Sequence, residues 1–262
     1  MWRWLGLFVN ERQKIILERL KSNKTVTVSE LASLFEVSIE TVRRDIISLE
    51  KTGLIKRIHG GATISKNLTI LPPLGERIGA NCEMKRRAAI AACELVREGD
   101  VISIESGSTA MAVIEVLKEN FKDLTVISNS SDVLNELERG TNFKLISTGG
   151  VYHRGERAFY GPAAEDTILS TNVKYAFLFP SAVTPDGVSI SIYDLLGVER
   201  AFMRNAQQTI FVFDSTKTIS NAVYKLSEVS TDHIYVTDDE LSDTDCDRFE
   251  DATGVRIIRY RK

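Results

Sequence analysis

The spacing of apolar residues predicts two short helices near the amino end of the chain. The first is expected over residues 11–20, ERQKIILERL, where the charged residues fall opposite four apolar ones, Ile15, Ile16, Leu17 and Leu20. A second helix is expected to begin after Thr27, because Thr27 and Glu30 have the spacing of a capping box. Its predicted buried residues are Leu31, Leu34 and Phe35.

A third amphipathic helix is predicted at residues 39–50, IETVRRDIISLE, with Ser38 as a suitable N-cap. Its expected buried stripe is Ile39, Val42, Ile46 and Leu49. The opposite face is expected to carry Thr41, Arg43 and Arg44, with Glu40 and Asp45 alongside. Hydroxyl and guanidinium groups on one face of a helix suit the DNA major groove, where arginine can bind guanine edges or phosphates.

The stretch GLIKRIHGGATI, residues 53–64, predicts two short strands around a turn. Lys56, Arg57 and His59 then lie where a hairpin could contact phosphates or the minor groove. A small helical bundle with solvated arginines would also accommodate one basic helix. Two helices, a tight connection, a basic third helix and a Gly-Gly hairpin in this order favour a DNA-binding unit instead.

The rest of the chain alternates between strand-like and helix-like segments. Residues 63–78 include Pro72 and Pro73 and are interpreted as a linker. A helix is then expected from residue 83 until Gly99 ends it. Short β-rich runs such as VISIE, LTVIS, YAFLF, TIFVFD and HIYVT alternate with helical segments. This alternation predicts an α/β domain with a mainly parallel sheet.

Polar loops follow several of these strands, at the end of a parallel sheet where ligands bind. Gly107 allows backbone N–H groups to approach an anion, and Lys217 in DSTK supplies a charge for a phosphate. The loop residues expected to bind a small phosphorylated ligand are Ser106, Gly107, Ser108, Thr109, Asn129, Ser130, Gly149, Gly150 and Lys217. Any one such loop is more often a simple turn, but several after successive strands favour a ligand site.

Composition narrows these expectations. The 262 residues have a net charge of −3, divided into +5 over residues 1–66 and −8 over the rest, so only the amino-terminal part is expected to meet a polyanion. The three cysteines and three histidines are scattered, which predicts no disulfide framework, no metal site and a cytoplasmic protein with reduced thiols. The apolar opening, MWRWLGLFVN, is too short for a membrane span. It is either a packed extension or the product of an upstream start.

The run VSELASLFEVSIETVRRDIISLEKTGLIKRIHGGA resembles the winged helix-turn-helix of the DeoR family of bacterial transcription regulators. The likeness extends over residues 11–62. It implies that Ser38, Thr41, Arg43 and Arg44 face DNA, and that the wing comprises Arg57, His59, Gly60 and Gly61.

The second half resembles the DeoR sensor domain, which is similar to the ribose-5-phosphate isomerase fold. The motifs that carry the likeness are ESGST, SNS, STGG, VERAFM, DSTKT and VTDD. In ESGST, Glu105 replaces the usual Asp and Ser108 the usual Thr. In VERAFM, Glu199 is retained, and its carboxylate could bind sugar hydroxyls. The resemblance implies a phosphorylated sugar, or a related metabolite, as effector.

The loop after YAFLF reads PSAVTPDG and lacks the acidic cluster that the isomerases carry there, so we expect a sensor and no enzyme. The predicted organisation is an extension (1–10), a winged helix-turn-helix (11–62), a linker (63–78) and an effector domain (79–262). The predicted function is a DNA-binding repressor of a carbohydrate operon. The expected partners are double-stranded DNA, a phosphorylated sugar and further copies of the chain, a dimer or tetramer, with no cofactor and no membrane. An isomerase-like enzyme fused to a DNA-binding unit, and a DNA binder without a ligand, remain as alternatives.

Overall fold

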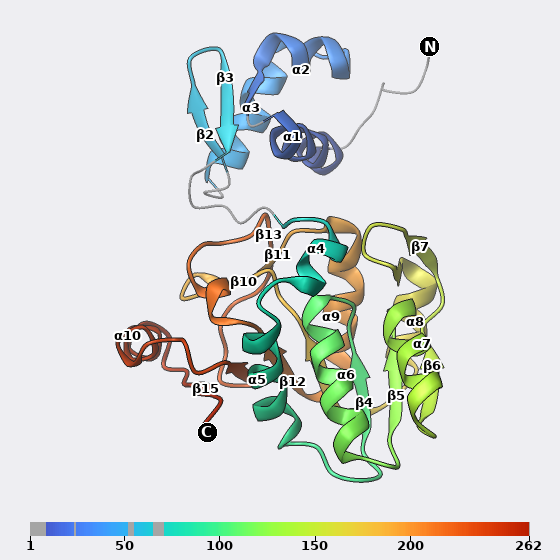
Figure 1. The fold of residues 1–262 in the computed structure, drawn as a ribbon. Coiled ribbons are helices and arrows are strands. Elements are labelled where there is room, and N and C mark those ends of the chain that lie inside the picture. Colours follow the sequence, from blue (N-terminus) through green and yellow to red (C-terminus); the bar gives the residue numbers. More distant parts are fainter. Residues whose placement is uncertain (1–8, 24, 52–54, 65–70, 262) are drawn as a thin grey trace.

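A computed structural model describes residues 9–23, 25–51, 55–64 and 71–261. Figure 1 shows two parts, which we call the head (residues 9–64) and the body (residues 71–261). The predicted extension, residues 1–10, lies outside the described residues except for Val9 and Asn10, which begin the first helix.

The head contains three helices and a small antiparallel sheet (Figure 1). Its elements are α1 (Val9–Asn23), β1 (Thr25–Thr27), α2 (Val28–Phe35), α3 (Ile39–Lys51), β2 (Ile55–Ile58) and β3 (Gly61–Ile64). The capping box at the start of α2 is confirmed. Thr27 Oγ1 accepts a hydrogen bond from Glu30 N at 3.2 Å, and Glu30 Oε2 accepts one from Thr27 N at 3.1 Å.

The sequence patterns did not indicate β1, which pairs with β3 and makes the hairpin a three-stranded sheet in the order β1-β3-β2. This pairing explains Gly61. A Cβ at position 61 would lie 2.0 Å from the backbone oxygen of Val26, so only glycine allows the two strands to approach this closely. Gly61 is accordingly buried, and its role within the head is steric.

Two predictions about α3 are wrong. Asp45 was expected beside the polar face, but it is 3% exposed and binds Arg12 through Nε–Oδ2 and Nη2–Oδ1 contacts of 2.7 and 3.1 Å. Helical spacing explains this, because Asp45 follows Val42 by three residues and precedes Leu49 by four. Ile39 was expected in the core but is 49% exposed. It shares a face with Arg43, four residues on, at the margin of the buried stripe. Similarly, Leu34 on α2 is only partly buried.

The body is built on a seven-stranded parallel sheet, which confirms the predicted α/β class. The strands are β4 (Val101–Ile104), β5 (Thr125–Ser128), β6 (Lys144–Ser147), β9 (Val173–Leu178), β12 (Ala206–Val212), β14 (His233–Thr237) and β15 (Ile257–Arg259). Their order is β15-β14-β12-β9-β4-β5-β6, and every pairing is parallel.

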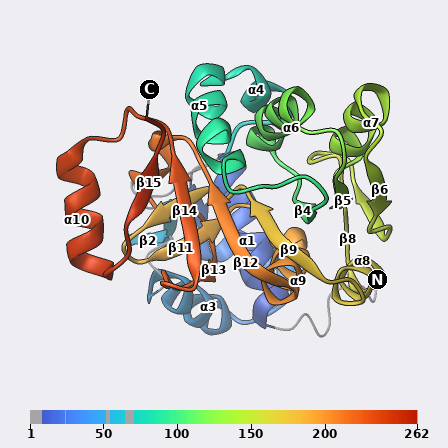
Figure 2. The same ribbon diagram turned by 90° about the horizontal axis from the view of Figure 1, so that it is seen from below.

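Helices cover both faces of this sheet (Figure 2). One face carries α5 (Cys82–Cys93), α6 (Ser108–Asn120) and α7 (Ser131–Gly140), and the other carries α8 (Pro162–Leu169) and α9 (Leu196–Asn205), with α10 (Asp243–Thr253) at one edge. Successive strand residues alternate between two hydrophobic cores. Phe177 belongs to the first and Leu178 to the second. Burial on both faces accounts for the continuous apolar strand segments.

Smaller elements complete the body. They are α4 (Leu74–Gly79), the hairpin β7 (Val151–His153) and β8 (Ala158–Tyr160), the sheet of β10 (Ala182–Thr184), β11 (Gly187–Ile190) and β13 (Tyr224–Ser227), and the 3₁₀ turns η1 (Tyr193–Leu195) and η2 (Ser215–Thr218). None of the helices among the described residues is long and apolar enough to span a bilayer.

The predicted linker, residues 63–78, is not irregular throughout. Thr63 and Ile64 belong to β3, and Leu74–Gly79 forms α4. Pro73 is compatible with this helix because it occupies the N-cap, where no intrahelical donor is needed. The next helix also ends earlier than expected, at Cys93, and Gly99 lies in the following turn with φ +80°.

The buried ion pair of the head gives a first prediction. Asp45→Ala removes the buried carboxylate that pairs with Arg12, so we expect the free energy of unfolding of the head to fall by about 3 kcal/mol. Urea unfolding followed by circular dichroism measures the change. Glu40→Ala is the matched control, because Glu40 lies on the same helix in a 61% exposed ion pair and should change stability by less than about 0.5 kcal/mol. Equal effects of the two variants would contradict the assignment.

Candidate DNA-binding face and candidate effector site

The residues expected to bind DNA lie together on the outer side of α3 and on the hairpin. Ser38 caps α3, since its Oγ accepts a hydrogen bond from Thr41 N at 3.1 Å and lies 2.9 Å from Thr41 Oγ1. Arg43 and Arg44 are exposed, and Arg43 makes only a loose contact of 3.6 Å with Glu40. The two hydroxyls therefore hold the start of the helix, and the arginines extend from its first half.

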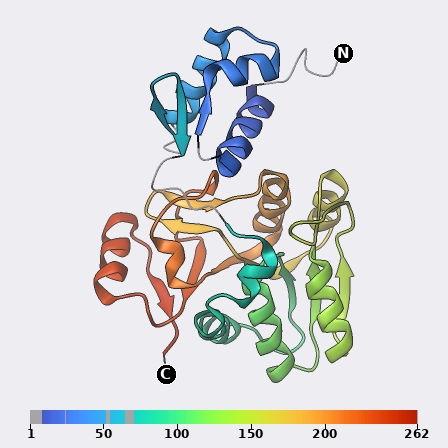
Figure 3. The same ribbon diagram turned by 45° about the horizontal axis from the view of Figure 1, so that its top comes forward.

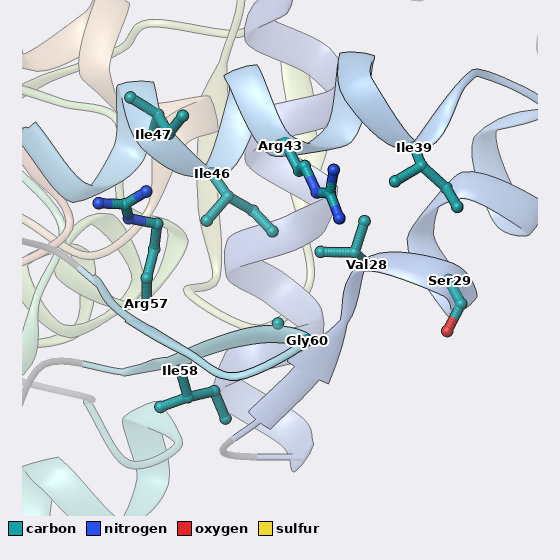
Figure 4. A pocket seen from close by; sticks show the side chains of 10 residues that line it. Val28, Ser29, Ile39, Arg43, Ile46, Ile47, Arg57, Ile58 and Gly60 are labelled. Carbon is teal, nitrogen blue, oxygen red and sulfur yellow. The ribbon is translucent and has the colours of Figure 1, made fainter.

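The hairpin stands beside α3 and forms the wing. Arg57 and His59 are exposed, and Gly60 makes the turn with φ +79°. Arg57 is ion-paired with Glu50 of α3, which also accepts a hydrogen bond from Arg57 N at 2.9 Å. This pair fixes the wing against the helix. Figure 4 shows Arg43 and Arg57 on either side of the space between helix and wing.

In the body, the polar loops gather at the carboxyl ends of the parallel strands, as predicted from the topology. Ser106 N, after β4, donates a 2.9 Å hydrogen bond to Asn129 Oδ1, after β5. The Asn129 amide also donates to Phe159 O at 3.2 Å. Both ends of this side chain are thus engaged within the protein, so Asn129 joins two loops and the β8 strand.

Two further predicted residues have local structural roles. Ser130 is the N-cap of α7, where its Oγ accepts a hydrogen bond from Val133 N at 3.3 Å. Gly149 and Gly150, with φ of +61° and +109°, follow β6 and lead into the β7–β8 hairpin. These residues shape the end of the sheet.

The loop after β4 leads directly into the amino end of α6. Gly107 has φ +151°, and a Cβ there would lie 3.2 Å from Phe179 Cβ, so glycine suits the position in both conformation and space. Ser108 and Thr109 occupy the first turn of this 13-residue helix. Its first N–H groups and positive dipole end are suited to an anion.

Three glutamates form a buried acidic group at this end of the sheet. Burial raises the pKa of Glu105 to about 8, although Phe179 N donates a 3.0 Å hydrogen bond to its Oε2. Burial also raises the pKa of Glu199 well above its usual value, and the charges of Glu105 and Glu156 add to this effect. Glu199 Oε2 is buried and has no hydrogen-bond partner within the part of the chain that the structure describes. A ligand that brings donors would satisfy it.

Three basic residues lie near this acidic group, and one of them is paired with it. Arg77 of α4 is ion-paired with Glu156 of the β7–β8 hairpin, and both side chains are 11% exposed. Lys217 of η2 is half-buried, and burial lowers its pKa while the charge of Asp214 opposes that effect. Lys85 of α5 donates hydrogen bonds to Arg77 O and, at 2.6 Å, to Ala80 O, so it holds the carboxyl end of α4.

Sequence reasoning missed Arg77, Lys85 and Glu156. Arg77 fell in the predicted linker, and Glu156 lies 79 positions away from it along the chain. Glu105 was noted only as a replacement for Asp. Neither periodicity nor loop composition marks such residues, because their relation depends on how α4, α5 and the β7–β8 hairpin pack around the sheet.

The head and the body share a contact at one end of β13. Val223, which precedes β13, is 3% exposed and belongs to the same hydrophobic cluster as Ile16, Leu20 and Phe35 of the head. Tyr224 packs against this cluster as well. Figures 1 and 3 show the head at this end of the body, close to β13 and α4. The core of the head is therefore completed by a residue of the body.

Comparison with known proteins identifies the family. Residues 12–67 match the DeoR-like helix-turn-helix domain, and residues 80–239 match the DeoR C-terminal sensor domain. The chain belongs to the DeoR family, and it is a DNA-binding transcription regulator. This confirms the resemblance stated above and the winged helix-turn-helix at the amino end.

Two relatives illustrate the similarity. The transcriptional repressor AccR of Agrobacterium fabrum is 30% identical over 230 residues, which cover 87% of this chain and 89% of that protein. The glycerol-3-phosphate regulon repressor of Escherichia coli is 29% identical over 227 residues, covering 86% and 89%. Among solved structures, ribose 5-phosphate isomerase A of Methanocaldococcus jannaschii matches with a TM-score of 0.40 and 19% identity over 53% of this chain and 56% of that chain. This likeness is too distant to bear on activity.

The acidic group makes stability depend on pH. Because the folded protein raises the pKa of Glu105 from 4.5 to about 8, its contribution is most favourable below pH 4.5 and is lost as the pH rises to about 8. Glu105→Gln removes this loss, so the melting temperature of the variant relative to the wild type should increase from pH 5.5 to pH 8.5. Thermal unfolding at several pH values measures it. Glu138→Gln, at an exposed position, should give a constant difference. A Glu105→Gln difference independent of pH would refute the raised pKa.

Proposed function

We propose that this regulator is a repressor of genes for carbohydrate use. In this proposal, α3 and the wing bind the operator, and a phosphorylated sugar at the carboxyl end of the parallel sheet changes the affinity for DNA. One observation supports this proposal above all: the same chain combines exposed arginines on the head with a buried, incompletely paired charge cluster in the body. The two relatives described above are named as repressors, which supports repression as the mode of regulation.

The DNA-binding residues that we propose are Ser38, Thr41, Arg43, Arg44, Arg57, His59 and Gly60. Arg43 and Arg44 extend from the first half of α3, the part of a recognition helix that meets base edges. The wing then lies against the neighbouring backbone, with Arg57 and His59 near phosphates. We assign Gly61 to the shape of the wing, because it is buried beneath β1.

The proposed effector site divides into a phosphate end and a hydroxyl end. Gly107, Ser108 and Thr109 at the start of α6 offer N–H and hydroxyl donors, and Lys217 offers a positive charge. Glu199 and its acidic neighbours offer acceptors for sugar hydroxyls. Ser106, Asn129, Ser130, Gly149 and Gly150 support this arrangement through the loops that they join.

A contact between the two domains supplies a route for regulation. Only six positions separate Lys217 from Val223, and the segment between them is attached to the small sheet. Asn221 Nδ2 donates to Asp186 Oδ2 at 3.1 Å, and Ala222 N donates to Ser189 Oγ at 2.8 Å. An effector that moves Lys217 would thus move Val223 in the core of the head. Regulation requires that the effector bind the two positions of this segment with different affinity.

We further propose that the protein works as a dimer or tetramer in the cytoplasm. Two heads would then contact half-sites about one helical turn apart, ~34 Å, or a multiple of that distance. An effector that changes how the heads are held would break this spacing.

An enzyme fused to a DNA-binding head is the second candidate, because buried glutamates with raised pKa values are suited to acid–base chemistry. Incubation with pentose and hexose phosphates distinguishes the two. Turnover that Glu199→Gln abolishes would favour the enzyme, whereas binding without turnover favours the sensor.

The DNA-binding proposal predicts the effect of two arginines. Arg43→Ala and Arg44→Ala should each weaken binding to the upstream DNA of the regulated gene by about tenfold, because each removes a base or phosphate contact. Fluorescence anisotropy over a range of salt concentrations measures the affinity. In a purified transcription reaction, the wild type should lower transcript yield and the double variant should not. Arg248→Ala, which removes a 74% exposed arginine of α10, is the control and should change nothing. Unchanged affinity of the double variant would overturn the assignment.

The effector proposal predicts that binding and response can be separated. In a thermal-shift panel of sugar phosphates, at least one compound should stabilise the wild type, and Lys217→Met should weaken its binding at least tenfold. Lys122→Met, at an exposed position, should not. Val223→Ala should keep the thermal shift but reduce the change in DNA affinity that the compound causes. If no compound in the panel shifted the melting temperature, the proposed effector class would be wrong.

A further inference from the structure

Three isoleucines are exposed on the DNA-binding face of the head. Ile39, Ile47 and Ile58 are 49%, 37% and 45% exposed. They line one groove of about 410 Å³ between α3 and the wing, which we call the α3–wing groove. Figure 4 shows this groove, with Ile39 near the start of α3 and Ile58 on the wing. Exposed apolar side chains gathered in one place indicate a surface that another molecule covers.

The charges around the groove identify the kind of molecule. Arg43 and Arg57 also line it, and both side chains are more than half exposed. The groove also lies between the recognition helix and the wing of a DeoR-like helix-turn-helix domain, so the molecule that fits it best is the DNA of the operator. Duplex DNA presents phosphates at its edges. Within the major groove, DNA presents one apolar group, the C5 methyl of thymine.

The position of Ile39 in α3 would place its side chain beside the base edges of the major groove. Ile39 is the first residue of α3, and Arg43 follows it by one helical turn on the same face. The first turn of a recognition helix lies deepest in the major groove. If Arg43 binds a guanine or a phosphate there, the side chain of Ile39 lies within reach of a neighbouring base pair. It has no polar atom, so it can recognise only an apolar group.

We propose that Ile39 is a specificity-determining residue that contacts the C5 methyl of one thymine in each half-site of the operator. The inference rests on the proposed DNA-binding face. It explains why an isoleucine at the margin of the core stripe remains exposed. Ile58 lies on the wing, which meets the backbone and the minor groove, and no thymine methyl lies there.

The test removes the methyl from the DNA. Each thymine of the bound site is replaced in turn by deoxyuridine, which keeps every hydrogen-bonding group and lacks only the C5 methyl. The affinity of the wild type should fall about fourfold at one position of each half-site, the value expected for one buried methyl group. Ile39→Ala should bind the thymine and deoxyuridine duplexes equally at that position.

The controls keep the outcomes distinct. Ile58→Ala alters an isoleucine of similar exposure in the same groove and should retain the full preference for thymine. Arg43→Ala tests whether α3 binds DNA at all. If Arg43→Ala weakens binding but no thymine is preferred, or if Ile39→Ala keeps the preference, the inference about Ile39 is wrong and the DNA-binding face stands. If Arg43→Ala has no effect and no thymine is preferred, both are wrong.

Discussion

Charge buried at the carboxyl end of the parallel sheet is the constraint on which the proposed regulation depends. Glu105, Glu156 and Glu199 come from three different elements, and one guanidinium, that of Arg77, is ion-paired with them through Glu156. Burial disfavours the charged forms of Glu105 and Glu199 and raises the pKa of both carboxyl groups, so the folded body favours the neutral forms of these two. A ligand with hydroxyl donors would relieve this cost. A buried acidic group of this kind is suited to the ligand binding that we propose for this site.

The head meets a different constraint, because a unit of this size cannot bury all of its apolar surface. Its core uses Asp45 and Arg12 as a buried ion pair and borrows Val223 from the body. Its outer face leaves Ile39 exposed beside Arg43. An exposed apolar side chain is unfavourable in water, and in the proposed complex the DNA major groove offers partners for both Ile39 and Arg43.

The two constraints meet in one short segment. Lys217 at its start lies among the buried charges, and Val223 at its end lies in the core of the head. Arg77 makes a second connection between the buried charges and the head, because it lies on α4, the first described element of the body after the head. A change in ligation at the end of the sheet is therefore close, along the chain and in space, to the packing that holds the DNA-binding helix. No long pathway of side chains is required for coupling.

The sequence by itself determined the features that depend on residues close together along the chain. The Thr27–Glu30 capping box, the Ser38 cap, the parallel α/β class and the position of the polar loops after the strands all follow from local spacing and from the rule for parallel sheets. Only the tertiary structure decided that Asp45 faces inward, that Ile39 faces outward, that β1 lies against Gly61, and that Arg77 meets Glu156 across 79 positions. Local patterns report which side of an element is apolar. They do not report which elements come together, because that depends on packing among residues far apart in the chain.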